Sequence, residues 1–230
     1  MRDLSFVLPA GGTVALVGEN GAGKTTLVKL LARLYDPTEG QMLVDGTDLR
    51  DIDPAAWWRQ VGVLFQDFVR YDLSVRENIG FGQLEQLDDA ARVAAAAARG
   101  GARELVAALP RGYDTVLGRT FVEGVDLSGG EWQKLGLSRA FMRHAQVLIL
   151  DEPTAALDAL AESAVCQRFT ALTHGKTTVF ISHRFSTVRL ADRILVLRDG
   201  QLAEQGTHGY LMERRGHYAR MFAAQAVRYQ

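Results

Sequence analysis

The chain has 230 residues, of which 47% are hydrophobic and 23% charged, a composition typical of a globular protein that can bury a core. The net charge is −1 at pH 7, and no segment gathers the lysines and arginines that a nucleic-acid partner would require, so none is expected. The single cysteine, Cys166, excludes an internal disulfide and a cysteine-rich metal site. No apolar run reaches the roughly 20 residues of a membrane-spanning helix, and the first residues do not have the pattern of a signal peptide.

The first part of the chain predicts a strand, a glycine-rich loop and a helix. The run GTVALVGE, residues 12–19, is apolar and β-branched, which is typical of a buried strand. The segment KTTLVKLLARLY, residues 24–35, has helical periodicity and is expected to end at Asp36. Four leucines share one face of this predicted helix: Leu27, Leu30, Leu31 and Leu34. The next segment, QMLVDGTDL at residues 41–49, predicts a short strand and an Asp-Gly hairpin turn.

Further predicted strands lie on both sides of a helical region. Three apolar runs predict buried strands, namely VGVLFQD at 61–67, VLILDEP at 147–153 and TTVFISH at 177–183. The segment RILVLRDGQLAEQG at 193–206 predicts a second Asp-Gly hairpin. In the middle of the chain alanine, leucine, arginine and glutamate dominate, with Gly/Pro breaks, so that region is expected to be helical. Strands that are apolar throughout point to a mostly parallel sheet covered by helices.

These elements predict one α/β domain. We expect an α/β core over residues 1–66 and 146–230, with a mostly parallel sheet and a small antiparallel β part, and a helical subdomain inserted over residues 67–145. No internal repeat or low-complexity linker divides the chain.

The glycine-rich loop is the most specific motif. GENGAGKT, residues 18–25, fits G-x-x-x-x-G-K-[ST] and lies between a predicted strand and a predicted helix, as a P-loop must. In such a loop the backbone N–H groups cradle phosphates, Lys24 reaches the β- and γ-phosphates, and Thr25 offers its hydroxyl to Mg²⁺. The sequence therefore predicts a P-loop NTPase of the RecA-like type that binds ATP or GTP. The expected contacts come from Glu19, Asn20, Gly21, Ala22, Gly23, Lys24, Thr25 and Thr26.

Polar residues follow three of the predicted strands. Asp151 is expected to hold Mg²⁺, and Glu152 to orient or deprotonate the attacking water. Gln66 could touch Mg²⁺ or the water, and His183 could hydrogen-bond the γ-phosphate. Taken alone, the Asp-Glu pair could equally be a solvated turn, and the other two could be ordinary loop residues. Ligands in open α/β sheets sit beyond the carboxyl ends of strands, which favours a shared site.

A second loop, LSGGEWQKL at residues 127–135, has two readings. Ser128 followed by Glu131 is a capping box, which predicts a well-capped helix. Gly129 and Gly130 would occupy its first helical positions, where glycine costs up to about 1 kcal/mol relative to alanine. Bare backbone there indicates that an anion approaches closely.

Four stretches in this order resemble the nucleotide-binding domain of ABC transporters: GENGAGKTT, LSGGEWQKL, VLILDEPTAALD and ISHRFSTVRLADRILVL. The likeness runs from about Leu4 to the C-terminus. The ENI sequence at 77–79, HRFSTVR, and the closing GTHGYLMERRGHYARMFAAQ are similar to the exporter type, in which this domain follows a membrane domain in one polypeptide.

The resemblance implies that two such domains pack head to tail and hold ATP and Mg²⁺ between them. Ser128, Gly129 and Gly130 would then contact the γ-phosphate of the ATP bound by a second domain, and Asp158, in AALD, would lie in the loop that links the two sites. Gln66 and the helices after it would sense a transmembrane domain, so the protein is expected at the cytoplasmic face of the cell membrane as part of a transporter.

Two features depart from the family pattern. The fifth residue of the signature stretch is commonly glutamine and here is Glu131, whose charge the capping geometry could turn away from phosphate. The family's adenine-stacking aromatic residue, on a strand upstream of the P-loop, has no counterpart after Met1. We therefore expect that this sequence lacks the N-terminal strand and the upstream membrane domain.

The leading functional hypothesis is an ATPase that powers transmembrane transport through ATP-driven dimerisation, with Lys24, Glu152 and His183 as its catalytic residues. One alternative is a nucleotide-gated clamp of the same superfamily that acts in DNA repair or on ribosomes. Another is a cassette that regulates without hydrolysing ATP, against which the intact motif residues argue.

Overall fold

The computed structural model describes residues 1–120, 123–154 and 172–226, and these residues form two compact units. The first unit comprises residues 1–61, 146–152 and 173–230, and the second comprises residues 62–145 and 153–172. Among the described residues, no helix combines the length and the apolar character that crossing a bilayer would require.

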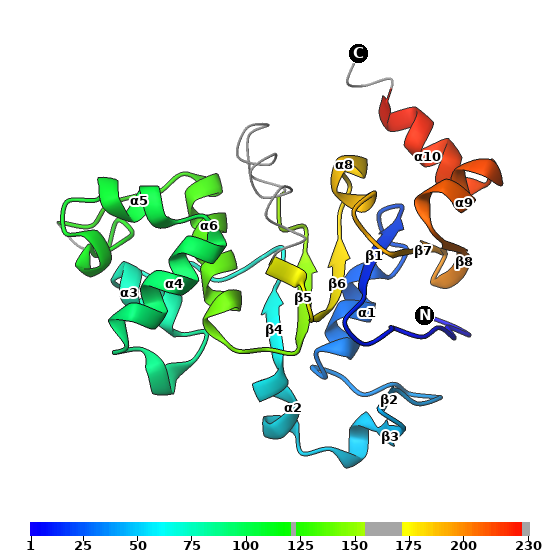
Figure 1. Cartoon of the computed structure of the whole chain (residues 1–230), viewed down its shortest axis with the longest axis horizontal. Helices are drawn as coiled ribbons and strands as arrows, with labels where there is room; N and C mark the ends of the chain where they lie inside the picture. Colours follow the sequence, from blue (N-terminus) through cyan, green and yellow to red (C-terminus); the bar gives the residue numbers. More distant parts are fainter. Residues whose placement is uncertain (121–122, 155–171, 227–230) are drawn as a thin grey trace. The chain divides into compact units, whose positions relative to one another are not determined.

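The first unit is an α/β structure built on a mostly parallel sheet (Figure 1). Its strands run in the spatial order β5-β6-β1-β7-β8, and only β8 pairs antiparallel to its neighbour. A separate two-stranded antiparallel sheet joins β2 and β3. The mostly parallel sheet with a small antiparallel part is thus confirmed. The elements of this unit are β1 (Thr13–Gly18), α1 (Lys24–Leu31), β2 (Leu43–Val44), β3 (Thr47–Asp48), η1 (Leu49–Asp51), α2 (Pro54–Gln60), β5 (Val147–Asp151), β6 (Thr177–Ile181), α8 (Phe185–Val188), β7 (Arg193–Arg198), β8 (Gln201–Gly206), α9 (His208–Glu213) and α10 (His217–Ala226).

Burial explains why the central strands read as unbroken apolar runs. Every residue of β1 is buried, as are four consecutive residues in each of β5, β6 and β7, because these strands are covered on both faces. The edge strand β8 instead alternates between exposed and partly buried residues, as expected for a strand with one face toward water.

Both predicted hairpin turns are confirmed by the backbone. Asp45 and Gly46 have φ angles of 49° and 84°, and Asp199 and Gly200 have 50° and 77°. Two consecutive residues with positive φ are what a two-residue type I′ hairpin turn requires, and the Asp-Gly pair tolerates this conformation well. These turns connect β2 to β3 and β7 to β8.

The helix after the P-loop ends earlier than its periodicity predicts. α1 stops at Leu31 instead of reaching Asp36, and Leu34, predicted to share one helix face with Leu27, is 49% exposed whereas Leu27 is buried. Arg33 takes a left-handed φ of 51°, and the Leu34 N–H donates to the Lys29 carbonyl, which closes the helix end. The guanidinium of Arg33 donates to the carbonyls of Ile52 and Arg50, which favours this bend.

The second unit consists mainly of helices around their own core (Figure 1). The core joins α3, α4, α5 and α6 through a cluster of buried apolar side chains that includes Ile79, Val93, Val106, Trp132 and Leu135. The elements of this unit are β4 (Val61–Leu64), α3 (Val75–Gly80), η2 (Leu84–Gln86), α4 (Ala90–Gly100), α5 (Arg103–Ala108), η3 (Gly112–Asp114) and α6 (Gly129–Met142), with Val61 itself counted in the first unit.

The contact between α4 and α6 is close enough to exclude a side chain. A Cβ atom at Gly100 would lie 2.1 Å from the Ser138 Oγ atom and 2.4 Å from the Ser138 backbone nitrogen. The close contact between α4 and α6 therefore requires glycine at position 100.

We expect Gly100→Ala to lower the free energy of unfolding by about 1–3 kcal/mol, because the added methyl must push α4 away from α6. Urea unfolding followed by circular dichroism measures this. The matched control is Gly209→Ala in α9, where an added Cβ meets nothing within 4 Å and the change should be neutral or stabilising. Equal stability of Gly100→Ala and the parent chain would contradict the close-packing argument.

Candidate nucleotide-binding and catalytic site

The register of the parallel strands brings three chain segments to one edge of the first unit's sheet. Leu16 of β1 pairs with Ile181 of β6, and Ile181 pairs with Asp151 of β5. Because these strands are parallel and end near this register, the segments that follow them begin at the same edge. Those segments are the P-loop, the Asp151-Glu152 pair and the loop that carries His183.

The P-loop backbone is fixed by glycines at both of its ends. A Cβ atom at Gly18 would lie 2.3 Å from the Leu197 backbone oxygen of β7, so only glycine lets the strand turn there. Gly23 precedes α1 with a left-handed φ of 98°, a conformation that glycine adopts without strain. The loop therefore delivers its backbone N–H groups and the start of α1 to the same edge, as phosphate binding requires.

Lys24 lies over the loop and is bonded to it. Its Nζ atom donates to the carbonyl oxygens of Gly18 at 2.8 Å and Glu19 at 2.9 Å, and the residue is only 7% exposed. Burial lowers the pKa of Lys24, while the carboxylates of Glu152 and Asp151 act in the opposite direction. The ammonium group is thus hydrogen-bonded to two carbonyl oxygens of its own loop.

Thr25 and Asp151 form the part of the site that suits a magnesium ion. The Thr25 hydroxyl lies 3.3 Å from the Asp151 Oδ2 atom, and Asp151 is buried at the end of β5. A hydroxyl and a carboxylate are hard oxygen ligands of the kind that Mg²⁺ takes beside bound phosphates. These two residues, predicted as metal ligands, therefore lie together and fit the ion.

Glu152 and His183 are in direct contact. The His183 Nε2 atom lies 3.1 Å from the Glu152 Oε1 atom, and the Glu152 N–H donates to the Ile181 carbonyl at 3.0 Å. Glu152 has a left-handed φ of 51°, which costs a non-glycine residue on the order of 1–2 kcal/mol. That conformation turns the chain sharply after β5 and leaves the carboxylate beside the His183 ring.

The remaining predicted site residues lie elsewhere in the chain. Gln66 follows β4 in the second unit. Ser128, Gly129 and Gly130 begin α6, also in the second unit. Asp158 lies outside the described residues. The roles assigned to these residues stay predictions.

The capping box of α6 is confirmed. The Ser128 N–H donates to the Glu131 Oε2 atom at 2.8 Å, and the Glu131 N–H donates to the Ser128 Oγ atom at 3.3 Å. The charge of Glu131 is thereby directed at its own helix N-terminus, where a carboxylate is favourable.

One contact at the site was not predicted from the sequence. The Gln225 side chain of α10 hydrogen-bonds the backbone on both sides of Arg184, next to His183. A glutamine in an amphipathic helix carries no pattern that singles it out, so only the structure reveals it.

Known proteins are similar to this chain in sequence and in fold. The model of the ABC transporter family matches residues 1–155. The chain belongs to the ABC transporter family. This ABC-family chain is 41% identical, with a TM-score of 0.89, to a solved structure of a bacterial Atm1-family ABC exporter with ATP bound, and the match covers 97% of this chain and 38% of that one. The P-loop NTPase fold of an ABC nucleotide-binding domain, and its likeness to exporters, are thus confirmed.

Curated relatives of the ABC-family chain are similar over almost its whole length. It is 45% identical over 97% of its residues to the ATP-dependent lipid A-core flippase of Methylococcus capsulatus, and 44% identical over 99% to the human mitochondrial potassium channel ATP-binding subunit. It is 40% identical over 93% to the subtilin transport ATP-binding protein SpaT of Bacillus subtilis. The chain spans about a third of the length of these relatives, namely 36%, 30% and 35%.

We expect Glu131→Ala to lower the free energy of unfolding by about 1 kcal/mol, because the Ser128 N–H loses its acceptor. Glu131→Gln should cost less, since an amide oxygen can still accept that hydrogen bond. Chemical unfolding of both variants measures the difference, with Lys134→Ala on the same helix as the control. Glu131→Ala as stable as the parent would show that the capping box contributes nothing.

Proposed function

We propose that this chain is the ATP-binding and ATP-hydrolysing domain of an exporter-type ABC transporter, and that it acts as one of a head-to-tail pair. One observation supports this most directly. Lys24, the Thr25–Asp151 pair and the Glu152–His183 pair belong to segments that leave the same edge of one parallel sheet. Together they supply a phosphate cradle, metal ligands and a base beside a histidine.

Binding would use the P-loop and Lys24. The triphosphate would lie against the loop's N–H groups and the start of α1, where the helix dipole favours negative charge. The Lys24 ammonium would exchange its hydrogen bonds to the Gly18 and Glu19 carbonyls for bonds to the β- and γ-phosphates. Thr25 and Asp151 would hold Mg²⁺, which supplies neutralisation of phosphate charge when it is bound.

Hydrolysis would use Glu152 and His183. A water oxygen would bond to the γ-phosphorus while the bond from that phosphorus to the β–γ bridging oxygen breaks, which releases ADP and inorganic phosphate. Glu152 would accept the water proton, because its carboxylate lies at the edge of the sheet from which the P-loop also emerges. Its side chain is 16% exposed. His183, 3.1 Å from that carboxylate, would orient it and hydrogen-bond the γ-phosphate.

The start of α6 would complete the site of a second domain. The first-turn N–H groups of a helix have no partner within the helix, and glycines at 129 and 130 leave this backbone uncovered by side chains. No lysine follows these glycines directly, as Lys24 follows Gly23, because the residue after Gly130 is Glu131. We therefore do not expect this loop to bind phosphate by itself as a P-loop does. We propose that Ser128, Gly129 and Gly130 contact the γ-phosphate held by the P-loop of another domain, with Gln66 and Asp158 in the roles that the family pattern implies.

The partners would be a second nucleotide-binding domain and a transmembrane domain. The relatives are about three times as long as this chain and include a flippase and a transport protein by name, which supports a membrane domain fused upstream. We place the domain at the cytoplasmic face of the cell membrane on the same basis. None of these relatives is named for DNA repair or for ribosomes, so the clamp alternative gains no support.

We expect Glu152→Gln to bind ATP with nearly the parent affinity and to lose at least ~100-fold in turnover, because the amide cannot accept the water proton. The variant should also accumulate as a dimer when ATP is present. Phosphate release and light scattering after size exclusion measure the two effects. Glu213→Gln, an exposed change in α9, is the control. Hydrolysis by Glu152→Gln at the parent rate would remove Glu152 from its assigned role.

We expect the rate of hydrolysis per chain to rise with chain concentration, because each complete site would need the α6 loop of a second domain. Phosphate release measured over a ~100-fold range of chain concentration at saturating ATP tests this. A rate per chain that stays constant while light scattering reports a monomer throughout would mean that one chain hydrolyses ATP alone.

A further inference from the structure

The loop that carries His183 is short and makes hydrogen bonds to a residue of another element. It joins the end of β6 at Ile181 to the start of α8 at Phe185. Within the loop, the Arg184 N–H donates to the Ser182 Oγ atom at 3.0 Å. The His183 side chain is 44% exposed, so burial alone does not fix its position.

Gln225, on α10, forms hydrogen bonds to the backbone of both His183 and Phe185. Its Nε2 atom donates to the His183 carbonyl oxygen, and its Oε1 atom accepts from the Phe185 N–H at 3.1 Å. One side-chain amide thus satisfies a backbone acceptor and a backbone donor across Arg184. A hydrogen bond at the His183 carbonyl restricts the peptide plane next to its Cα, and so restricts the direction of the imidazole.

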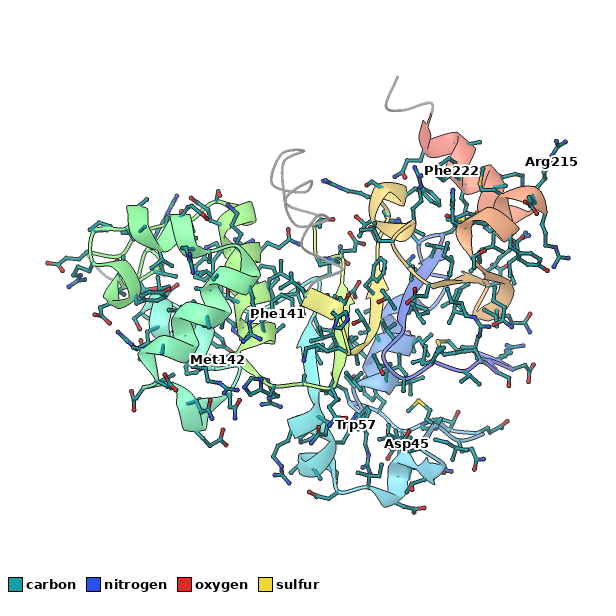
Figure 2. The ribbon with its side chains drawn as sticks, in the orientation of Figure 1. Asp45, Trp57, Phe141, Met142, Arg215 and Phe222 are labelled. Atoms are coloured by element: carbon teal, nitrogen blue, oxygen red, sulfur yellow. The ribbon has the colours of Figure 1, made fainter. Side chains whose placement is uncertain are left out.

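Aromatic packing holds the same loop against α10. The Phe185 ring meets Tyr218 at 5.4 Å and Phe222 at 5.1 Å between centroids, both edge to face, and Figure 2 labels Phe222 on this helix. Tyr218 is fully buried, and its hydroxyl lies 2.8 Å from the His208 Nδ1 atom of α9. The helix that carries Gln225 is therefore fixed in position by the packing of these aromatic side chains.

The other end of α10 is anchored near the P-loop. The Glu204 carboxylate of β8 accepts from the N–H groups of His217 and Tyr218, which is a favourable place for a negative charge. The His217 Nε2 atom is buried and lies 3.7 Å from the Oε1 atom of Glu19, a P-loop residue. One helix thus contacts both loops that frame the proposed reaction, through His217 at its start and Gln225 near its end.

We propose that Gln225 is a positioning residue for ATP hydrolysis: it fixes the His183 backbone so that the imidazole stays beside Glu152. This inference rests on the proposed function, because it assumes that the Glu152–His183 pair acts in hydrolysis. Gln225 touches neither the nucleotide nor the water in this account and acts only through His183. Its removal should therefore affect turnover and leave nucleotide binding by the P-loop intact.

The test compares Gln225→Met with Gln205→Met. The first keeps the length of the side chain and removes both hydrogen bonds, and the second makes the same change at an exposed position of β8. We expect Gln225→Met to lower kcat for ATP hydrolysis about three- to tenfold with KM nearly unchanged, since each lost hydrogen bond weakens the hold on the loop modestly. Gln205→Met should change neither constant.

A second measurement reports on His183 without requiring activity. The chain contains five histidines, each of which gives ring signals in ¹H–¹³C spectra. The signal that is lost in a His183→Gln variant is that of His183. In Gln225→Met the His183 signal should move or broaden, while that of His174, on another part of the first unit, stays in place.

Gln225→Glu provides a check if Gln225→Met folds poorly. It keeps an acceptor for the Phe185 N–H and loses the donor to the His183 carbonyl, so it should show the same split between kcat and KM and the same shift of the His183 signal. An unchanged kcat together with an unchanged His183 signal in a folded Gln225 variant would overturn the inference. A parent chain that binds ATP and never hydrolyses it would instead overturn the proposed function, and the spectra would still decide whether Gln225 holds His183.

Discussion

The pairing register of β1, β5 and β6 is the constraint on which the candidate site depends. Hydrogen bonds between these strands align Leu16, Ile181 and Asp151, so three distant parts of the sequence emerge at one edge. A shift of one residue would turn each strand's side chains to the opposite face and would place Asp151 away from Thr25. The unbroken apolar character of these strands makes such a shift costly, because every alternative register disturbs a packed core.

Charged side chains are buried at this edge of the sheet, although burial by itself disfavours a charged group. Lys24 and Asp151 are both buried, and neither would be stable there without its partners. The Lys24 ammonium has two carbonyl oxygens and the field of two carboxylates, and the Asp151 carboxylate has the Thr25 hydroxyl. The site is therefore an electrostatic arrangement that the sheet imposes and the loop geometry satisfies.

Local patterns in the sequence were sufficient for much of this structure. The P-loop, the Asp-Gly hairpins and the Ser128–Glu131 capping box each depend on residues that are close in the chain, and each was predicted. The predicted end of α1 was wrong, because the observed end depends on hydrogen bonds from Arg33 to the carbonyls of Ile52 and Arg50. The periodicity of the helix sequence carries no information about such distant contacts. The contact of Glu152 with His183 follows from β5 and β6 being neighbours, and the order of strands is a tertiary property. The contact of Gln225 with the His183 loop depends on how α10 packs, for the same reason.

The hydrogen bonds of Lys24 to its own loop also bear on how its ammonium group would meet different anions. Two of the three ammonium N–H donors are bonded to the Gly18 and Glu19 carbonyls, so a small anion that bonds only to Lys24 could use the third without displacing either carbonyl. A polyphosphate that takes two or more of these N–H donors would instead replace the loop carbonyls, and it could add bonds to several loop N–H groups in the same event. The self-bonding of Lys24 would therefore matter more for chains of phosphates, which can engage several of its N–H donors, than for single ions such as sulfate or free phosphate.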